Sequence, residues 1–405
     1  MSRVALIAVA LVGFAAAGTT AMAEEGPQVS RAAGKTLKAA QEACQAKNFS
    51  ECIAKAKEAN GVSGKNAYDT YVANSLLMQA YAAQNSPETA SYAEQLVESS
   101  YMPAANKAQL IRFLMSNAYQ QKSYEKAIQY AERVRAGGDN SEDVSILIAQ
   151  SNYLLGKYKE SMAAMDSVVS RAEQAGRKPS EKGLNVIWSC AVKLKDQAAA
   201  SRAVEKLILH YPKPEYWLNA TAVLADNADS NDDRIKLMTY RLKNEVGILK
   251  HGEEFRDMAL IAMDRGNPGE AQSVMEQAFA KNLFTDATQK ESNQRLLDTA
   301  KKKVAMDKAN LPKDEKVAAA AKTGDALVEI GGAYIGYAQY DKAITSINAG
   351  IAKGGLKYPD EAYILLGIAY ERSKNTAEAV KAFGKATTDP KYTRLAKLWA
   401  LEARS

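Results

Sequence analysis

Apolar residues in this chain recur three and four positions apart, in runs separated by turn-forming residues. After Pro390, for example, Leu395, Leu398 and Trp399 share one side of a helix while charged residues occupy the rest. Between the runs lie turn signals, such as the adjacent glycines Gly354 and Gly355. No run has the alternation with period two that is typical of a strand. The pattern predicts a chain made of short α-helices.

Two pairs of segments resemble each other at a constant distance along the chain. Tyr124 recurs 34 residues later as Tyr158, and three residues near the C-terminus recur after 36 residues. These three are Gly331, Tyr334 and Ala343, which correspond to Gly367, Tyr370 and Ala379. A period of 34 residues with small residues where two helices cross is typical of the tetratricopeptide repeat (TPR), a helical hairpin. We therefore expect an all-α, right-handed α-solenoid of about ten TPR-like hairpins with a C-terminal capping helix.

The repeat pattern also predicts where the units begin and how the chain divides. The expected units begin near Ala33, Tyr71, Ala108, Glu142, Glu181, Pro214, Gly252, Lys290, Gly324 and Asp360. We expect a signal peptide over 1–23, a solenoid over 24–300 and a C-terminal repeat pair with its capping helix over 324–405. Residues 301–323 are rich in lysine and contain Pro312, so we expect a degenerate spacer or hinge there.

The first residues have the features of an export signal. Arg3 precedes an apolar run, and Ala21, Met22 and Ala23 then form an A-x-A site ahead of two glutamates. A membrane anchor is the alternative, but it needs about 20 apolar residues and this run is shorter. We therefore expect cleavage after Ala23, a periplasmic location and a mature chain with no membrane span.

Composition and charge exclude several classes of function. Lysine and arginine number 53 against 47 acidic residues, and no basic stripe interleaved with aromatic residues is present, so we expect no nucleic-acid partner. The chain has two histidines, His210 and His251, far apart and without ligand spacing around them. No phosphate-binding loop, nucleophile elbow or dinucleotide fingerprint is present. We expect no metal, no cofactor, no catalytic residues and no enzymatic activity.

The three cysteines can form one disulfide bond. Cys44 and Cys52 face each other across the expected turn of the first hairpin, and an exported chain meets an oxidising environment. A disulfide between them is geometrically possible. Alternatively both are small core residues, because Cys52 stands where other units place alanine. If the bond forms, Cys190 is left as a buried, unpaired thiol.

One face of the first helices is the candidate site for a partner. In a curved solenoid this face turns inward and lines a groove, whereas the other positions pack in the core. We expect the groove to include eight residues of two neighbouring units: Gln109, Arg112, Ser116, Tyr119, Asp143, Ile146, Gln150 and Tyr153. The alternative is that some of them are only solvated.

Three segments are similar to a known group of proteins. They are 207–224 (LILHYPKPEYWLNATAVL), 352–370 (AKGGLKYPDEAYILLGIAY) and 381–402 (KAFGKATTDPKYTRLAKLWALE). The chain resembles the periplasmic TPR proteins associated with the TonB, ExbB and ExbD energy-transduction systems of Gram-negative bacteria. The resemblance implies a protein-binding scaffold that is accessory to TonB-dependent transport across the outer membrane. The alternative function is an envelope-assembly or cell-wall coordinating TPR factor.

Overall fold

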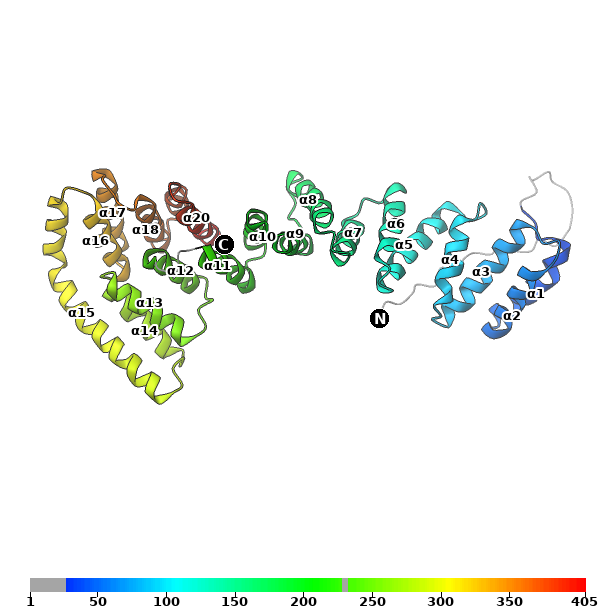
Figure 1. The fold of residues 1–405 in the computed structure, drawn as a ribbon, viewed down its shortest axis with the longest axis horizontal. Helices are drawn as coiled ribbons and strands as arrows, with labels where there is room; N and C mark the ends of the chain where they lie inside the picture. The colour runs from blue at the N-terminus through cyan, green and yellow to red at the C-terminus, as the bar shows by residue number, and fades with distance from the viewer. Residues whose placement is uncertain (1–26, 228–231) are drawn as a thin grey trace. The chain divides into compact units, whose positions relative to one another are not determined.

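The computed structural model describes residues 27–227 and 232–405 (Figure 1). These residues form twenty α-helices and no strand, which confirms the all-α prediction. The expected signal peptide, 1–23, lies outside the described residues. The chain divides into two compact units, each described separately below: an N-terminal unit, 1–177 with 189–195, and a C-terminal unit, 178–188 with 196–405.

The N-terminal unit consists of successive helical hairpins. Its helices are α1 (Arg31–Gln45), α2 (Phe49–Gly61), α3 (Ala67–Ala83), α4 (Glu88–Glu98), α5 (Ala104–Gln120), α6 (Tyr124–Ala136), α7 (Glu142–Leu154) and α8 (Tyr158–Gln174). Each odd-numbered helix packs against the next, and α2 and α6 also pack against the helices that follow them. A continuous apolar core extends from α1 to α7. Fully buried alanines such as Ala40 and Ala127 allow the helices to approach closely.

Polar residues begin several of these helices. The Asn48 side chain accepts a hydrogen bond from the Glu51 amide at the start of α2, and Asn66 and Asp69 form a reciprocal capping box at the start of α3. In the first hairpin Cys44 and Cys52 form a disulfide, with their Cα atoms 5.1 Å apart. Both cysteines are also part of the apolar core.

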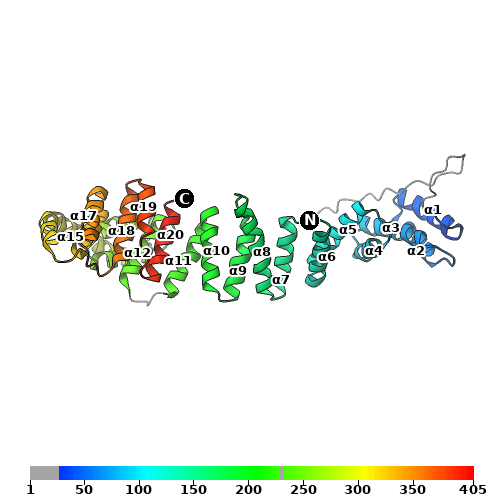
Figure 2. The same cartoon turned by 90° about the horizontal axis from the view of Figure 1, so that it is seen from above.

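The C-terminal unit contains further hairpins and two single helices. Its helices are α10 (Gln197–His210), α11 (Pro214–Asn227), α12 (Asp233–Glu245), α13 (Gly252–Asp264), α14 (Pro268–Ala280), α15 (Ala287–Ala320), α16 (Asp325–Gly336), α17 (Tyr340–Lys353), α18 (Pro359–Arg372), α19 (Thr376–Phe383) and α20 (Pro390–Glu402). Helix α9 (Glu181–Lys193) contributes residues to both units. Within this unit α17, α18, α19 and α20 lie side by side (Figure 2).

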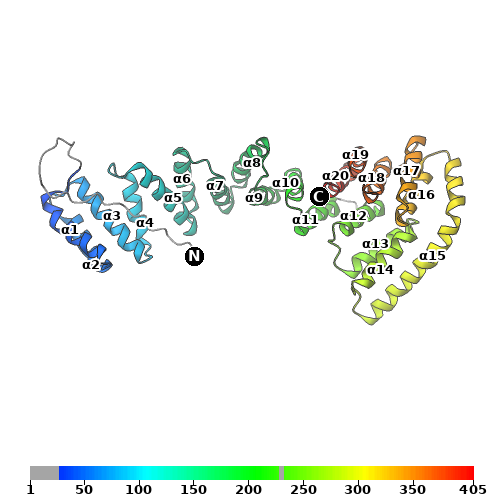
Figure 3. The ribbon, with the colours of Figure 1, turned by 180° about the vertical axis from the view of Figure 1, so that it is seen from behind.

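Helix α15 differs from the expected hairpin near Lys290 and from the expected hinge at 301–323. It is one helix of 34 residues that continues through Pro312, so this proline does not interrupt it. The helix runs along α14 and α16 and packs against both (Figure 3). Leu297, Ala300 and Leu311 are buried on that side. We attribute the continuity to this packing, because a proline inside a helix by itself removes a hydrogen bond and disfavours the preceding turn.

The last helix makes more contacts than the expected cap of one repeat. Helix α20 packs against α18 and α19, as a capping helix should, and Trp399 is fully buried against Phe383 of α19. It also packs against α10, α11 and α12. Arg394 on α20 donates a hydrogen bond to the Ser201 hydroxyl on α10. The last helix of the unit therefore joins its last hairpin to its first helices.

Candidate binding sites in the two units

Four of the predicted groove residues lie on α5. Gln109, Arg112 and Ser116 are exposed, and Tyr119 is half-buried. Arg112 forms an ion pair with Asp139, which lies in the turn before α7. Burial raises the pKa of Tyr119, with a smaller contribution from Tyr124. These residues form a polar face, and the Arg112 charge on it already has a partner within the chain.

The other four predicted residues lie on α7, and three of them fit an open face. Asp143 is exposed, while Gln150 and Tyr153 are half-buried. The Tyr119 hydroxyl donates a hydrogen bond to Gln150 Oε1 over 3.4 Å, so the structure brings these two residues of neighbouring hairpins together. Ile146 is only 8% exposed, which corrects its assignment to the groove: an aliphatic side chain at this position packs inward. Partner binding by the other residues stays a prediction.

A cavity that the sequence did not predict lies in the C-terminal unit. It measures about 220 Å³ and lies between α12, α16, α18 and the turn that joins α13 to α14. Its lining combines cations, carboxylates and apolar side chains. The charged members are Arg234, Arg241, Arg265, Lys357, Asp325, Glu329 and Glu361. Such a mixed lining provides donors and acceptors for a polar ligand.

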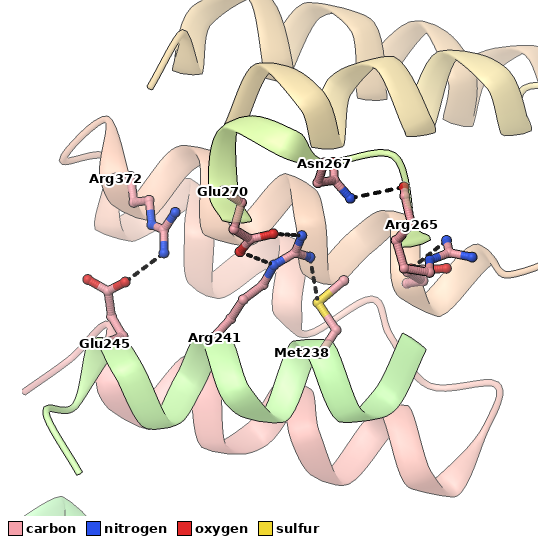
Figure 4. Close-up of polar contacts among 8 residues, drawn as sticks. Met238, Arg241, Glu245, Arg265, Asn267, Glu270 and Arg372 are labelled. Atoms are coloured by element: carbon pink, nitrogen blue, oxygen red, sulfur yellow. Dashed lines mark hydrogen bonds and ion pairs between the residues drawn. The ribbon is translucent and has the colours of Figure 1, made fainter. Parts of the chain in front are cut away.

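Two ion pairs link the helices around this cavity, and one of them, between Arg241 and Glu270, is buried (Figure 4). Arg241 on α12 donates two hydrogen bonds to Glu270 on α14, over 2.7 and 2.5 Å, and the two side chains are only 3% and 7% exposed. One helical turn further on, Glu245 accepts a hydrogen bond of 2.9 Å from Arg372 on α18. Bidentate pairing of this kind holds a guanidinium in one orientation. The pairs therefore fix how α12, α14 and α18 lie relative to one another.

Two arginines share one carboxylate in the cavity itself. Glu361 on α18 accepts a hydrogen bond of 2.6 Å from Arg234, and Arg265 lies 3.6 Å from its other oxygen. The Arg234 guanidinium also lies over the Tyr358 ring, 4.0 Å from its centre. Burial alone would lower the pKa of Arg234, but the Glu361 charge and hydrogen bond outweigh it, so the pKa is raised. Arg234 is therefore kept cationic, and the two guanidinium charges exceed that of the single carboxylate.

A second hollow of about 590 Å³ lies at the start of α13 and α15. Lys250, Arg256 and Ser292 are among its lining residues. Asn293, 4% exposed, also lines it; its amide donates a hydrogen bond to the Gln289 carbonyl, while its Oδ1 atom has no partner. A buried acceptor without a donor is unfavourable.

Other kinds of site are not found in the part of the chain that the structure describes. Across 27–227 and 232–405, no group of three or more histidine, cysteine or acidic residues could hold a metal ion. Within the same residues, no helix is both long and apolar enough to cross a membrane. Cys190 is buried, donates a hydrogen bond of 3.2 Å to the Ser161 hydroxyl, and has a pKa that burial raises. A raised pKa opposes formation of a nucleophilic thiolate.

The sequence does carry a signal for the cavity. Arg234, Leu237, Arg241 and Glu245 are spaced by three or four residues, so the charges share one face of α12 with core leucine. Charges on the apolar face of a helix are rare unless they are paired. This spacing identifies buried ion pairs on α12, but their partners lie on other helices and are not adjacent in sequence.

Comparison with known proteins supports the repeat type. Residues 360–388, which cover α18 and α19, match the family model described as the tetratricopeptide repeat. No curated protein matches the chain. The match at 360–388 agrees with the sequence prediction of a repeat unit that begins near Asp360.

Several solved structures are similar to the chain at low identity. The TPR2AB domain of yeast Sti1 in a pHSP90 complex is 14% identical, covers 75% of this chain and all of that one, and has a TM-score of 0.25. The Naa15/Naa10 structure bound to HypK-THB is 12% identical over 88% of this chain and 58% of that one, with a TM-score of 0.35. Yeast Tom70 is 11% identical over 87% and 84%, with a TM-score of 0.24.

These values carry no inference about partners, so the repeat type rests on the matched family model and on the helical hairpins themselves. Tetratricopeptide repeats generally serve as protein-binding scaffolds and not as catalysts. The chain is built of helical hairpins, and its residues 360–388 match the tetratricopeptide repeat.

Proposed function

We propose that this protein is a periplasmic protein-binding scaffold, accessory to TonB-dependent transport across the outer membrane. Its tetratricopeptide-type hairpins support the scaffold role. The export signal expected at 1–23 supports the location. The link to TonB, ExbB or ExbD rests on the resemblance of segments 207–224, 352–370 and 381–402 to periplasmic TPR proteins of these systems.

The cavity of the C-terminal unit is the observation on which the binding role rests. Arg234 and Arg265 share one carboxylate, Glu361, so part of their hydrogen-bonding capacity is open to a ligand. Lys357 adds a further cation to the lining, which also contains the carboxylates of Asp325 and Glu329. The apolar side chains beside them would contact the rest of a peptide. We propose that an acidic side chain of a partner segment binds here.

Crosslinking in cells tests the identity of the partner. A photoreactive residue in place of Lys357, at the cavity, is activated in intact cells and the attached proteins are identified by mass spectrometry. We expect a component of the TonB, ExbB and ExbD system. Recovery of cell-wall synthases without any such component would contradict the transport role and favour the envelope-assembly alternative. A mature N-terminus at Glu24 would support export through the signal peptide.

Two variants with the same change of net charge test the cavity. Arg265→Gln removes a cation of the lining, whereas Arg202→Gln removes one from the exposed surface of α10. We expect Arg265→Gln to weaken binding of the recovered partner about tenfold, because the lost hydrogen bond is charge-assisted. Arg202→Gln should bind as the unmodified protein does. Equal binding by all three proteins would exclude this cavity as the site.

A further inference from the structure

Helix α15 has one face that no other helix of the C-terminal unit covers. It is centred on Met306, and we call it the outer face of α15. Because successive residues of an α-helix are rotated by about 100°, Lys302, Lys313 and Val317 lie within about 40° of Met306 around the helix axis. Figures 1 and 3 show α15 along one side of the unit, with α14 and α16 on its inner side.

The inner side of α15 holds the buried residues of the helix and two of the three acidic residues of its second half, whereas the third, Asp314, is exposed and lies about 80° around the axis from Met306. Leu297, Leu311 and Ala318 are buried there. The hydroxyl of Tyr337, the residue directly after α16, donates a hydrogen bond to Asp307, and the Tyr334 hydroxyl on α16 donates one to Glu315, both over 2.5 Å. Two carboxylates of this lysine-rich stretch are therefore held toward α16 and away from the outer face.

The outer face, by contrast, combines exposed lysines with exposed apolar side chains. Met306 and Val317 are 66% and 62% exposed, the highest values for large apolar residues in the part of the chain that the structure describes. Lys302, Lys303 and Lys313 are exposed beside them. In the described residues none of these lysines has a carboxylate partner. Between Thr299 and Ala320, the positions within about 60° of Met306 include no acidic residue.

This segregation of charge matches an anionic lipid surface. The ammonium groups of lysine side chains are attracted to lipid phosphates, while the aliphatic parts of these side chains can lie along the apolar region of the membrane. A helix can lie in the plane of such a surface and insert its apolar side chains at the boundary of the head groups. The other residues of the face include Ala309 and Ala320, which are too small to keep Met306 and Val317 away from the lipid.

The outer face of α15 also fits a fluid lipid bilayer better than the surface of a folded protein. Specific protein interfaces rely on fixed, complementary side chains, usually around an aromatic anchor. The outer face has no aromatic residue, and its lysines are long and without ion-pair partners in the described residues. Neither of the two cavities described above is lined by it. We propose that the outer face of α15 docks the protein on an anionic lipid membrane, with α15 parallel to the surface.

Vesicle sedimentation tests the proposal with the purified full chain. Vesicles of phosphatidylcholine alone are compared with vesicles that contain about 30% phosphatidylglycerol, an anionic lipid. We expect binding to the anionic vesicles only, and a weaker affinity at higher salt because the attraction is screened. Equal binding to neutral vesicles, or no binding to the anionic ones, would overturn the proposal.

Two double variants separate charge from apolar insertion. Lys302→Gln with Lys313→Gln should weaken binding roughly 25-fold, since each lysine near an anionic surface contributes about a factor of five. Met306→Ser with Val317→Ser keeps the charge and should weaken binding several-fold. Because these side chains are exposed, circular dichroism should show unchanged helicity and thermal unfolding.

A control with the same change of net charge completes the experiment. Lys182→Gln with Lys381→Gln removes two exposed lysines of the same unit that lie outside α15. This variant should lose less than threefold in affinity. An equal loss in the control would show that net charge alone drives binding, which would contradict a specific face. Binding of polyglutamate with no binding of anionic vesicles would point to an acidic protein partner and would also overturn the lipid proposal.

Discussion

Gly331 and Gly332 are neighbours on α16, yet their surroundings differ. A Cβ atom added at Gly331 would overlap the Ile347 side chain of α17 and lie 3.2 Å from the Ala343 carbonyl oxygen. At Gly332 it would meet Asn267 Oδ1 at 3.5 Å, an ordinary van der Waals contact. The close crossing of α16 and α17 therefore requires glycine at the first position and not at the second.

Alanine substitution at both positions tests this difference. Gly331→Ala should lower the free energy of unfolding by about 1–3 kcal/mol, because Ile347 is fully buried and the core has no room for another methyl group. Gly332→Ala should raise the free energy of unfolding, by less than about 1 kcal/mol, because alanine is the better helix former. Urea denaturation followed by circular dichroism measures both. Equal effects of the two substitutions would contradict the close crossing.

The Arg241 and Glu270 pair gives a second prediction at the residue scale. Arg241→Met leaves the Glu270 carboxylate buried without its partner, which should cost about 3–5 kcal/mol. Adding Glu270→Leu should restore much of the loss, because an apolar pair needs no desolvation of charge. A double-mutant cycle in urea measures the coupling. Additive losses would show that the two side chains do not depend on each other.

At the scale of elements, the turn inside each hairpin has a feature that repeats. The residue that lies two positions before the second helix has a positive φ in most hairpins, including 61° at Lys47, 59° at Lys122, 70° at Gly266 and 65° at Lys374. This left-handed conformation normally favours glycine. Because lysine and not glycine occupies several of these positions, the residue types alone did not reveal that the turns share this left-handed conformation. The turn is imposed by the packing of the two helices it joins.

The contact between α18 and α20 should depend on pH. Glu371 near the end of α18 and Glu402 at the end of α20 each have a buried Oε2 atom without a hydrogen-bond partner. Burial raises the pKa of Glu371, the neighbouring Glu402 carboxylate and then the charge of Glu245 raise it further, while Arg372 acts in the opposite direction. The folded state therefore keeps a proton at Glu371 above the ordinary pKa of 4.5.

The sign of the pH dependence follows from linkage. Above pH 4.5 the unfolded chain releases this proton while the folded state retains it, so the contribution of Glu371 to stability falls as the pH rises toward its folded-state pKa. Glu371→Gln cannot release a proton and should flatten this decline between about pH 6 and about pH 9. Thermal unfolding of both proteins across this range measures the slope. A steeper decline in the variant would contradict the assignment.

At the scale of the whole molecule, a change in one hairpin should alter the stability of that hairpin and its neighbours. In helical repeat proteins each unit contacts mainly its neighbours, so a change in one hairpin has little effect on distant ones. The disulfide between Cys44 and Cys52 lies in the first hairpin of the N-terminal unit. The helices α16 to α19 belong to the C-terminal unit. The two regions can therefore be followed separately.

Reduction of the disulfide tests this locality. The bond closes a loop of 8 residues, and its loss should cost the first hairpin about 2–3 kcal/mol through the entropy of the unfolded chain. Hydrogen exchange should then accelerate in α1 to α3 and stay unchanged in α16 to α19. The Cys44→Ser, Cys52→Ser double variant should not respond to reductant. Faster exchange in both regions would show that stability is shared across the chain.

The local structure of this protein follows from its pattern of apolar and small residues. Periodic apolar residues specify helices, and small residues specify close crossings, so most expected unit starts agree with observed helix starts, as at Glu142 and Gly252. The period also predicts the repeat matched at 360–388. These features depend on residues that are near one another along the chain, which is why pattern alone reveals them.

Features that join distant residues depend instead on the packing of the folded chain. Arg234 and Glu361 meet across 127 positions of sequence, and Arg394 and Ser201 meet across 193. Packing on α14 and α16 keeps α15 helical through Pro312, where local propensity predicts a break. The cavity, the long helix and the contacts of α20 result from such packing, because the free energy that stabilises them comes from neighbours that the local pattern does not identify.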